Sequence, residues 1–251
     1  MDPIRERITV TDGDVRLVGI LERPSAEPGP LVIVLHGFTS AKDRPHTIAA
    51  CEAMREAGFA TLRMDLYGHG ESGGRFEKHT LYKWISNTLA AMDHVRGMGY
   101  REIWLSGHSQ GGLTAALAAG MEADRVAGLV LRAPAFMIPE CARKGSMLGF
   151  TFDPDHIPDR IKVIKDLELE GTYVRVAQTI HAEEAVARFK GPVLILHGDA
   201  DDTVPLADSR KAAEAYANAV LAVMEGETHH FDIHPERMQE IIRTWMKGQE
   251  N

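Results

Sequence analysis

Few cysteines and no long apolar run set the first limits on this chain of 251 residues. Its two cysteines, Cys51 and Cys141, lie far apart and lack metal-ligand spacing, so we expect free thiols in a reducing compartment, the cytoplasm. The chain starts with charged residues, and no run approaches the roughly 18 apolar residues that span a bilayer. These absences argue against a disulfide framework, a signal peptide and membrane insertion.

An excess of basic charge is also missing. The formal net charge is −8, and no basic stripe stands out. Nucleic acid and anionic membranes require a basic face that neutralises phosphate, so we expect neither as a partner. The hydrophobic content of 44% is enough for one large globular core. Composition leaves the oligomeric state open, with a homodimer as one alternative.

The chain does have a repeated alternation of strand-like and helix-like segments. Two strand patterns around Asp12-Gly13, at 8–10 and 15–22, predict an opening hairpin. Short apolar runs then alternate with helical patterns, which predicts an α/β fold with a doubly wound, mostly parallel sheet of about eight strands. The later strands are expected at 31–37, 59–66, 102–106, 126–134, 192–199 and 219–226, and the helices at 47–58, 81–97, 110–123, 206–218 and 235–248.

This alternation stops between residues 135 and 189. No buried-strand run appears there, the segment mixes Met, Phe, Pro and charge, and a helical pattern covers 173–189. The stretch is too long for a plain connection between two core elements. We therefore predict a lid inserted after the sixth strand, over 135–189, with 1–134 and 190–251 forming the core.

A serine between two glycines stands where one predicted strand gives way to a helix. Gly107, Ser109 and Gly111 form Gly-x-Ser-x-Gly, and the glycines allow a sharp turn without a Cβ clash. In the strand-turn-helix setting this is the nucleophile-elbow pattern, which exposes one hydroxyl at the edge of the sheet. Ser109 is therefore the candidate nucleophile.

A serine hydroxyl is a weak nucleophile at neutral pH, so it needs a histidine base and an acid that orients the histidine. Both follow later in the chain, each just beyond a predicted strand. Spacing after the preceding glycine favours Asp201 over Asp199 and Asp202 as the acid, and His229 over His230 as the base. The chain order of serine, aspartate and histidine agrees with this pattern.

Two backbone N–H groups are needed where negative charge develops during attack. One belongs to Gln110, directly after the nucleophile, and the other is expected at Phe38, in the loop after the third strand. The sequence lacks the P-loop ending, the EF-hand pattern and the His-Glu-x-x-His motif. We therefore expect neither a cofactor nor a metal.

With these motifs, the chain resembles the α/β-hydrolase superfamily over nearly its whole length. More narrowly, it resembles the bacterial feruloyl (cinnamoyl) esterases that carry a small lid after strand six. The similar stretches are HGFTS, RMDLYGHGESGGRFE, GHSQGG, RAPA, HGDADDTVP and, most narrowly, FDPDHIPDRIKVIKDLELEGTYVRVAQ. The resemblance implies hydrolysis of hydroxycinnamate esters, with Ser109, Asp201 and His229 as the triad and Phe38 and Gln110 as backbone donors.

The resemblance also points to substrate-binding residues in the lid. Lid residues of such enzymes contact the phenolic end of the acyl group, and Tyr173 matches a tyrosine there. Where those lids tend to place an aspartate, this chain has Cys141 with Glu140 beside it. Phe136 belongs to the aromatic and methionine content that we expect to line the acyl pocket.

The leading hypothesis is a serine carboxylic ester hydrolase that forms an acyl-enzyme on a small-molecule ester. A general short-chain carboxylesterase, a lysophospholipase and a thioesterase use the same machinery and stay open. A noncatalytic ligand-binding relative is a further alternative, which steady turnover after a burst would exclude. A haloalkane dehalogenase needs an aspartate in the elbow, where this chain has Ser109.

Overall fold

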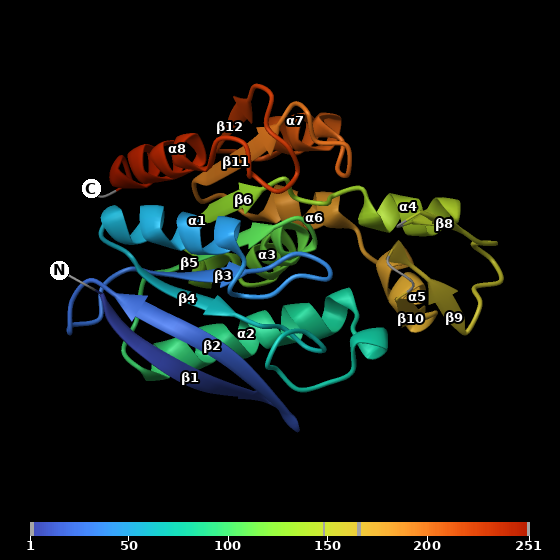
Figure 1. Ribbon diagram of the computed structural model, residues 1–251, viewed down its shortest axis with the longest axis horizontal. Helices are drawn as coiled ribbons and strands as arrows, with labels where there is room; N and C mark the ends of the chain where they lie inside the picture. Colours follow the sequence, from blue (N-terminus) through green and yellow to red (C-terminus); the bar gives the residue numbers. More distant parts are fainter. Residues whose placement is uncertain (1–2, 148, 165–166, 250–251) are drawn as a thin grey trace.

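A single eight-stranded sheet forms the centre of the molecule (Figure 1). The computed structural model describes residues 3–147, 149–164 and 167–249. The strand order is β1-β2-β4-β3-β5-β6-β11-β12, in which β2 pairs antiparallel with β1 and β4 and every other pair is parallel. The strands span Ile4–Asp12 (β1), Val15–Arg23 (β2), Leu31–Leu35 (β3), Ala60–Met64 (β4), Ile103–His108 (β5), Leu129–Arg132 (β6), Val193–Gly198 (β11) and Ala219–Met224 (β12). The predicted doubly wound, mostly parallel sheet is confirmed.

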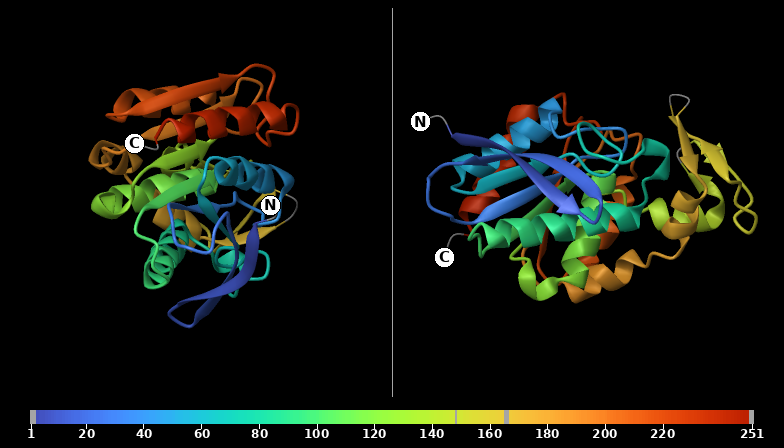
Figure 2. Two further views of the ribbon diagram at one scale, coloured as in Figure 1. Left: turned by 90° about the vertical axis from the view of Figure 1, so that its left-hand side faces the viewer. Right: turned by 90° about the horizontal axis from the view of Figure 1, so that it is seen from below.

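Helices cover both faces of this sheet, as Figure 2 shows from two further directions. Helices α1 (Pro45–Glu56) and α8 (Pro235–Lys247) pack together on one face. The opposite face is covered by α2 (Leu81–Gly97), α3 (Gln110–Met121) and α7 (Leu206–Ala215), and the short 3-10 helices η1 (Phe76–Lys78) and η2 (Ala123–Arg125) lie in connecting loops.

The double cover explains why β3 is apolar throughout. In β3, the side chains of Leu31, Ile33 and Leu35 enter the core on one face, while Val32 and Val34 enter the core on the other. Successive side chains of a strand point to opposite faces, so a strand buried on both sides has no polar position to alternate. The parallel strands also carry their following loops to one edge of the sheet, which is where ligands bind in such folds.

The described residues between β6 and β11 include seven short elements, most of which extend beside the core (Figure 1). They are α4 (Ile138–Lys144), β7 (Ser146–Met147), β8 (Phe150–Thr151), β9 (Arg160–Lys162), β10 (Glu168–Glu170), α5 (Thr172–Gln178) and α6 (Ala182–Arg188). Strand β7 pairs with β8 and β9 with β10, both antiparallel. These strands of two or three residues were not expected from the sequence, because they are too short to show periodicity.

The helical pattern at 173–189 is two helices rather than one. The chain leaves the helix after Gln178, and the Arg143 guanidinium donates to the carbonyls of Gln178 and Ile180. Arg143 of α4 therefore gives hydrogen bonds to two carbonyls that, in a continuous helix, would accept from backbone N–H groups of the same helix. The second helix, α6, packs closely on α3, where a Cβ on Gly120 would lie 2.4 Å from Ala185 Cα. This helix thus lies in the layer that covers the sheet.

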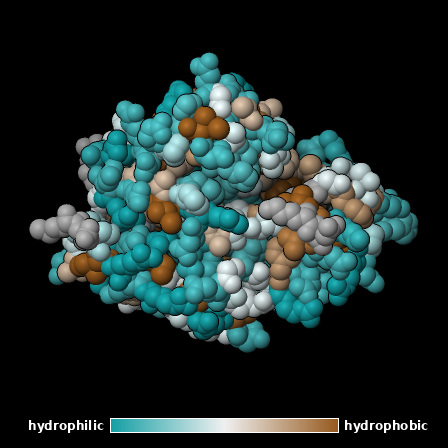
Figure 3. All heavy atoms as spheres, viewed as in Figure 1, coloured by the Kyte–Doolittle hydropathy of each residue, from teal (hydrophilic) through white to brown (hydrophobic). Residues whose placement is uncertain are grey.

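The face seen in Figure 3 is mostly hydrophilic, with hydrophobic residues showing where this segment meets the core. A shared apolar cluster joins the two parts there. It contains Leu113 and Leu117 of α3 together with Ile138, Ile161, Leu169 and Val174 from the segment. The segment therefore packs on the core through buried apolar side chains.

Candidate active site

Ser109 lies in a strained turn between β5 and α3. Its backbone has φ 55° and ψ −122°, a region that residues other than glycine rarely adopt. The turn requires the backbone to come close to its neighbours on both sides, and Gly107 and Gly111 allow this approach because they have no Cβ. A Cβ on Gly107 would lie 2.1 Å from the Gly111 carbonyl oxygen, and a Cβ on Gly111 would lie 2.3 Å from the His36 carbonyl oxygen.

The loops after β11 and β12 bring the predicted acid and base together. His229 Nδ1 lies 2.7 Å from Asp201 Oδ2, and both side chains are almost completely buried. Because a carboxylate accepts, Nδ1 carries the proton and Nε2 is left as the basic nitrogen. This is the tautomer that a general base acting on a serine requires.

Asp201 is held as a carboxylate by several donors. Burial alone raises its pKa, but hydrogen bonds from His197, His229 and the Val204 N–H outweigh burial, so the pKa lies well below its ordinary value. His197 Nε2 lies 3.2 Å from Asp201 Oδ2, and His197 Nδ1 lies 2.7 Å from Ser209 Oγ. Sequence reasoning missed His197, although it stands four residues before Asp201 in the same motif.

The competing candidates have other surroundings. Asp199 accepts a hydrogen bond from the Gly226 N–H at 2.7 Å, which joins the two loops. Asp202 is exposed and accepts from the Thr203 hydroxyl. His230 is exposed as well. Among the described residues, Asp201 is thus the carboxylate bonded to His229.

The peptide before Phe38 is fixed by a buried histidine. His36 Nε2 accepts from the Leu66 N–H at 3.0 Å, so its Nδ1 carries the proton and donates to the Gly37 carbonyl at 2.8 Å. The C=O and N–H of one trans peptide point in opposite directions, so this bond sets the direction of the Phe38 N–H. In the described part of the chain, neither the Phe38 N–H nor the Gln110 N–H has a protein acceptor.

A buried ion pair anchors the same loop further along. Lys42 Nζ lies 2.7 Å from Asp65 Oδ2, and the Lys42 N–H donates to Asp65 Oδ1 at 2.8 Å. Asp65 follows β4, so the pair joins the loop after β3 to the loop after β4. Gly70 packs against this carboxylate, from which an added Cβ would be only 2.2 Å away. The sequence offered no pairing signal for these residues.

His108, the residue before Ser109, links the serine turn to the histidine loop. Its Nε2 donates to the His229 carbonyl at 2.8 Å, and the two rings lie 4.6 Å apart between centroids. A Cβ on Gly37 would lie 3.0 Å from His108 Nδ1, so the loop after β3 packs on the same imidazole. Burial, followed by the nearby His46, lowers the pKa of His108 well below its ordinary value, which keeps the ring neutral.

Tyr173 contacts the residues that carry both predicted backbone donors. Its hydroxyl donates to Gln110 Oε1 at 2.7 Å, and its ring lies 6.4 Å from the Phe38 ring. The side chain is fully buried, and burial raises the pKa of Tyr173 above its usual value. The predicted contact of Tyr173 with substrate stays a prediction, while the structure gives its hydroxyl an acceptor within the protein.

The other predicted lid residues lie around α4. Phe136 and Glu140 line a pocket of about 120 Å³ between α4, α6 and α7, which neither Ser109 nor Tyr173 lines. Glu140 also pairs with Lys144 at the surface. Cys141 is half-buried, and burial, with the Asp208 and Glu140 carboxylates, raises its thiol pKa. The predicted substrate-binding residues are therefore divided between two places.

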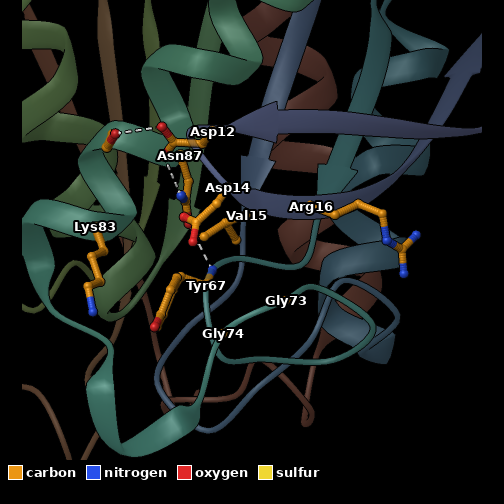
Figure 4. Close-up of a pocket in the computed structure, with 10 residues that line it drawn as sticks. Asp12, Asp14, Val15, Arg16, Tyr67, Gly73, Gly74, Lys83 and Asn87 are labelled. Atoms are coloured by element: carbon orange, nitrogen blue, oxygen red, sulfur yellow. Dashed lines mark hydrogen bonds between the residues drawn. The ribbon is translucent and has the colours of Figure 1, made fainter.

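A larger pocket, of about 590 Å³, opens between the β1-β2 hairpin and α2, and no predicted site residue lines it (Figure 4). Some of its polar groups are already bonded. Asp12 accepts from Ser86 and Asn87, and Lys83 lies over the Tyr67 ring.

Neither a metal cluster nor a membrane-spanning helix appears in residues 3–147, 149–164 and 167–249. No three His, Cys, Asp or Glu side chains gather there as metal ligands. No helix in these ranges is long and apolar enough to cross a bilayer. The expectation that no cofactor is needed stays a prediction.

A doubly wound sheet with a strained serine turn and a buried aspartate-histidine pair at one edge defines an α/β-hydrolase. The family model described as serine aminopeptidase, S33, matches residues 26–159. The chain belongs to this α/β-hydrolase family.

Relatives match almost the whole chain, and one of them, Est1E, is of known structure. Est1E from Butyrivibrio proteoclasticus with ferulic acid bound is 43% identical, covers 96% of this chain and 98% of its own, and superposes with a TM-score of 0.94. A second structure of Est1E is 40% identical, over 97% and 98% of the two chains, with a TM-score of 0.90. The monoacylglycerol lipase of Mycolicibacterium smegmatis is 25% identical over 92% of this chain and 88% of its own. Fold, family and these relatives identify a serine esterase that acts on small-molecule esters.

Proposed function

We propose that the protein hydrolyses hydroxycinnamate esters of the feruloyl type through an acyl-enzyme. The observation that carries the proposal is the 2.7 Å bond between His229 Nδ1 and Asp201, in a loop joined to the serine turn by His108. The bound ferulic acid of Est1E supports this acyl class. The Phe76 ring, whose centroid lies 5.5 Å from that of the Phe38 ring, supports an acyl group with a ring.

In the proposed mechanism, Ser109 Oγ attacks the ester carbonyl carbon while His229 Nε2 takes its proton. Asp201 stabilises the resulting imidazolium and keeps its orientation. The carbonyl oxygen becomes an oxyanion and accepts from the Phe38 and Gln110 N–H groups. The C–O bond then breaks, and the imidazolium gives its proton to the departing alcohol. Water, activated by the same imidazole, hydrolyses the acyl-enzyme.

We propose further that residues 135–189 act as a lid over the acyl group. Support comes from their position beside the sheet edge that holds Ser109 and from their apolar side chains, among which the Phe150 and Phe152 rings stack at 6.1 Å. The free state of Cys51 and Cys141 is compatible with the proposed cytoplasmic setting.

The decisive experiment compares turnover of methyl ferulate, a p-nitrophenyl butyrate ester and an acyl thioester by wild type and Ser109→Ala. We expect wild type to prefer the ferulate, and Ser109→Ala to lose at least about 10³ in kcat on every ester, because only the attacking group is lost. Near-normal turnover by Ser109→Ala would refute the mechanism. A preference for butyrate would favour the general carboxylesterase, and capture without turnover would favour a ligand-binding protein.

A further inference from the structure

We infer that Tyr173 is a positioning residue, which acts through Gln110 to hold the oxyanion-binding N–H groups in place, because its buried hydroxyl bonds the Gln110 side chain while its ring packs beside Phe38. The inference rests on the proposed function, in which these two residues supply the backbone donors. It assigns a residue of the inserted segment to the rate of reaction rather than to recognition of the acyl group.

The Gln110 peptide follows a strained residue and is held at its carbonyl, because the Ser109 C=O accepts backbone N–H groups from α3 and from Ala135. Its N–H direction is set by the turn at Ser109, whose φ of 55° would relax if its surroundings did not hold it. The Gln110 side chain is almost fully buried, and its Oε1 accepts from Tyr173 at 2.7 Å. The Gln110 Nε2 has no partner among the described residues. Among the described residues, the Tyr173 hydroxyl is therefore the hydrogen-bond partner of this side chain, and its bond adds to the backbone bonds of the turn.

The second donor residue, Phe38, packs beside the same tyrosine. The Phe38 ring lies 6.4 Å from Tyr173 and 5.5 Å from His79, and His79 lies 5.1 Å from Tyr173, all between ring centroids. The three rings thus form one packed group. Movement of Tyr173 would disturb Phe38 as well as Gln110.

A role in direct recognition fits the geometry less well. The Tyr173 side chain is fully buried, and its one proton is already donated to Gln110. A hydroxyl that binds a substrate phenol would have to give up this bond or accept a second one. A role in positioning Gln110 needs only the hydrogen bond that the Tyr173 hydroxyl already makes.

The first test is Tyr173→Phe, which removes the hydroxyl and keeps the ring. We expect kcat to fall by about tenfold on methyl ferulate and p-nitrophenyl butyrate alike, with KM changed less than about twofold, because the loss appears only in the transition state. Tyr82→Phe is the matched control. The Tyr82 hydroxyl bonds Thr179 Oγ1 at 2.7 Å between α2 and the residue after α5, but half of this side chain is exposed.

The second test measures oxyanion binding directly with an alkyl trifluoromethyl ketone. Ser109 Oγ bonds to the carbonyl carbon, its proton passes to His229, and the ketone oxygen becomes the oxyanion. The inhibition constant should rise in Tyr173→Phe by the same factor by which kcat falls. Gln110→Met, which keeps the backbone N–H but removes the side-chain acceptor, should show the same loss. The double variant should be no worse than either single variant.

Three results would overturn the inference. A loss confined to the ferulate would make Tyr173 a substrate contact. A lower melting temperature with unchanged kcat and inhibition constant would make it purely structural. Additive losses in the double variant would separate Tyr173 from Gln110. If Ser109→Ala kept its activity, the proposed function itself would fail, and that outcome is read from a different variant.

Discussion

At the residue scale, three neighbouring aspartates differ in what their carboxylates contact. Asp201 accepts from His229, from the Val204 N–H and from the Thr203 N–H. Asp199 bonds a backbone N–H of the adjacent loop, and Asp202 faces solvent. Of these three carboxylates, the Asp201 carboxylate is therefore the one that bonds His229, the predicted base.

This contrast predicts that Asp201→Asn loses at least about 10³ in kcat, because an amide that donates to His229 Nδ1 stabilises the wrong tautomer. Asp199→Asn and Asp202→Asn should stay within about threefold of wild type, since surface changes away from the machinery have small effects. Steady-state kinetics on one ester compares all three. A severe loss in Asp199→Asn or Asp202→Asn would transfer the acid role to that residue.

Chain order and spacing predict Ser109, Asp201 and His229 as the triad, because each follows a strand and the elbow has a distinctive glycine pattern. They do not reveal the partners of these residues. The bond from His108 to the His229 carbonyl joins residues 121 positions apart, and the bond from Tyr173 to Gln110 joins residues 63 positions apart. Such pairs depend on how the elements pack, which no local pattern in one sequence records.

At the scale of elements, the core was predictable because each strand and helix has its own period. Strand β3 is a continuous apolar run, and α2 spans the predicted residues 81–97. The segment between β6 and β11 has no such period, since its strands are two or three residues long and its last helices are divided by contacts from Arg143. Its structure depends on packing against the core.

The junction of β5 and α3 gives a prediction at this scale. Gly107→Ala should lower the free energy of unfolding by about 1 to 3 kcal/mol, because the added Cβ would overlap the Gly111 backbone and must displace the elbow. It should also reduce kcat, since Ser109 moves with the turn. Urea unfolding and ester kinetics measure the two effects.

Gly97→Ala is the matched control for this change. Gly97 ends α2, and nothing lies within 4 Å of an added Cβ. Alanine should raise the free energy of unfolding by up to about 1 kcal/mol through its better helix propensity. Equal stability of both variants would show that the backbone approach at the elbow is not tight.

At the scale of the whole molecule, we expect the buried histidines to make the stability of the fold depend on pH. Burial lowers the pKa of five histidines, to about 3 for His36 and His79, to about 2 for His46, and below the ordinary value for His69 and His108. These rings are neutral in the folded protein. In the unfolded chain each would titrate near pH 6.5.

The folded pKa values are depressed, so the contribution of these histidines to stability is present in full above about pH 6.5 and is lost as the pH falls toward the folded values. Between pH 6.5 and 5.5 the unfolded chain takes up protons that the folded protein does not, at a cost of about 1 kcal/mol for each such histidine. Urea unfolding at pH 7.5, 6.5 and 5.5 should therefore show a steep loss below pH 6.5. His79→Asn, which keeps a donor for the Phe76 carbonyl but cannot titrate, should reduce that loss by about 1 kcal/mol. A stability that is flat from pH 6.5 to 5.5 would contradict depressed pKa values for these histidines, and equal slopes in both proteins would contradict a depressed pKa for His79.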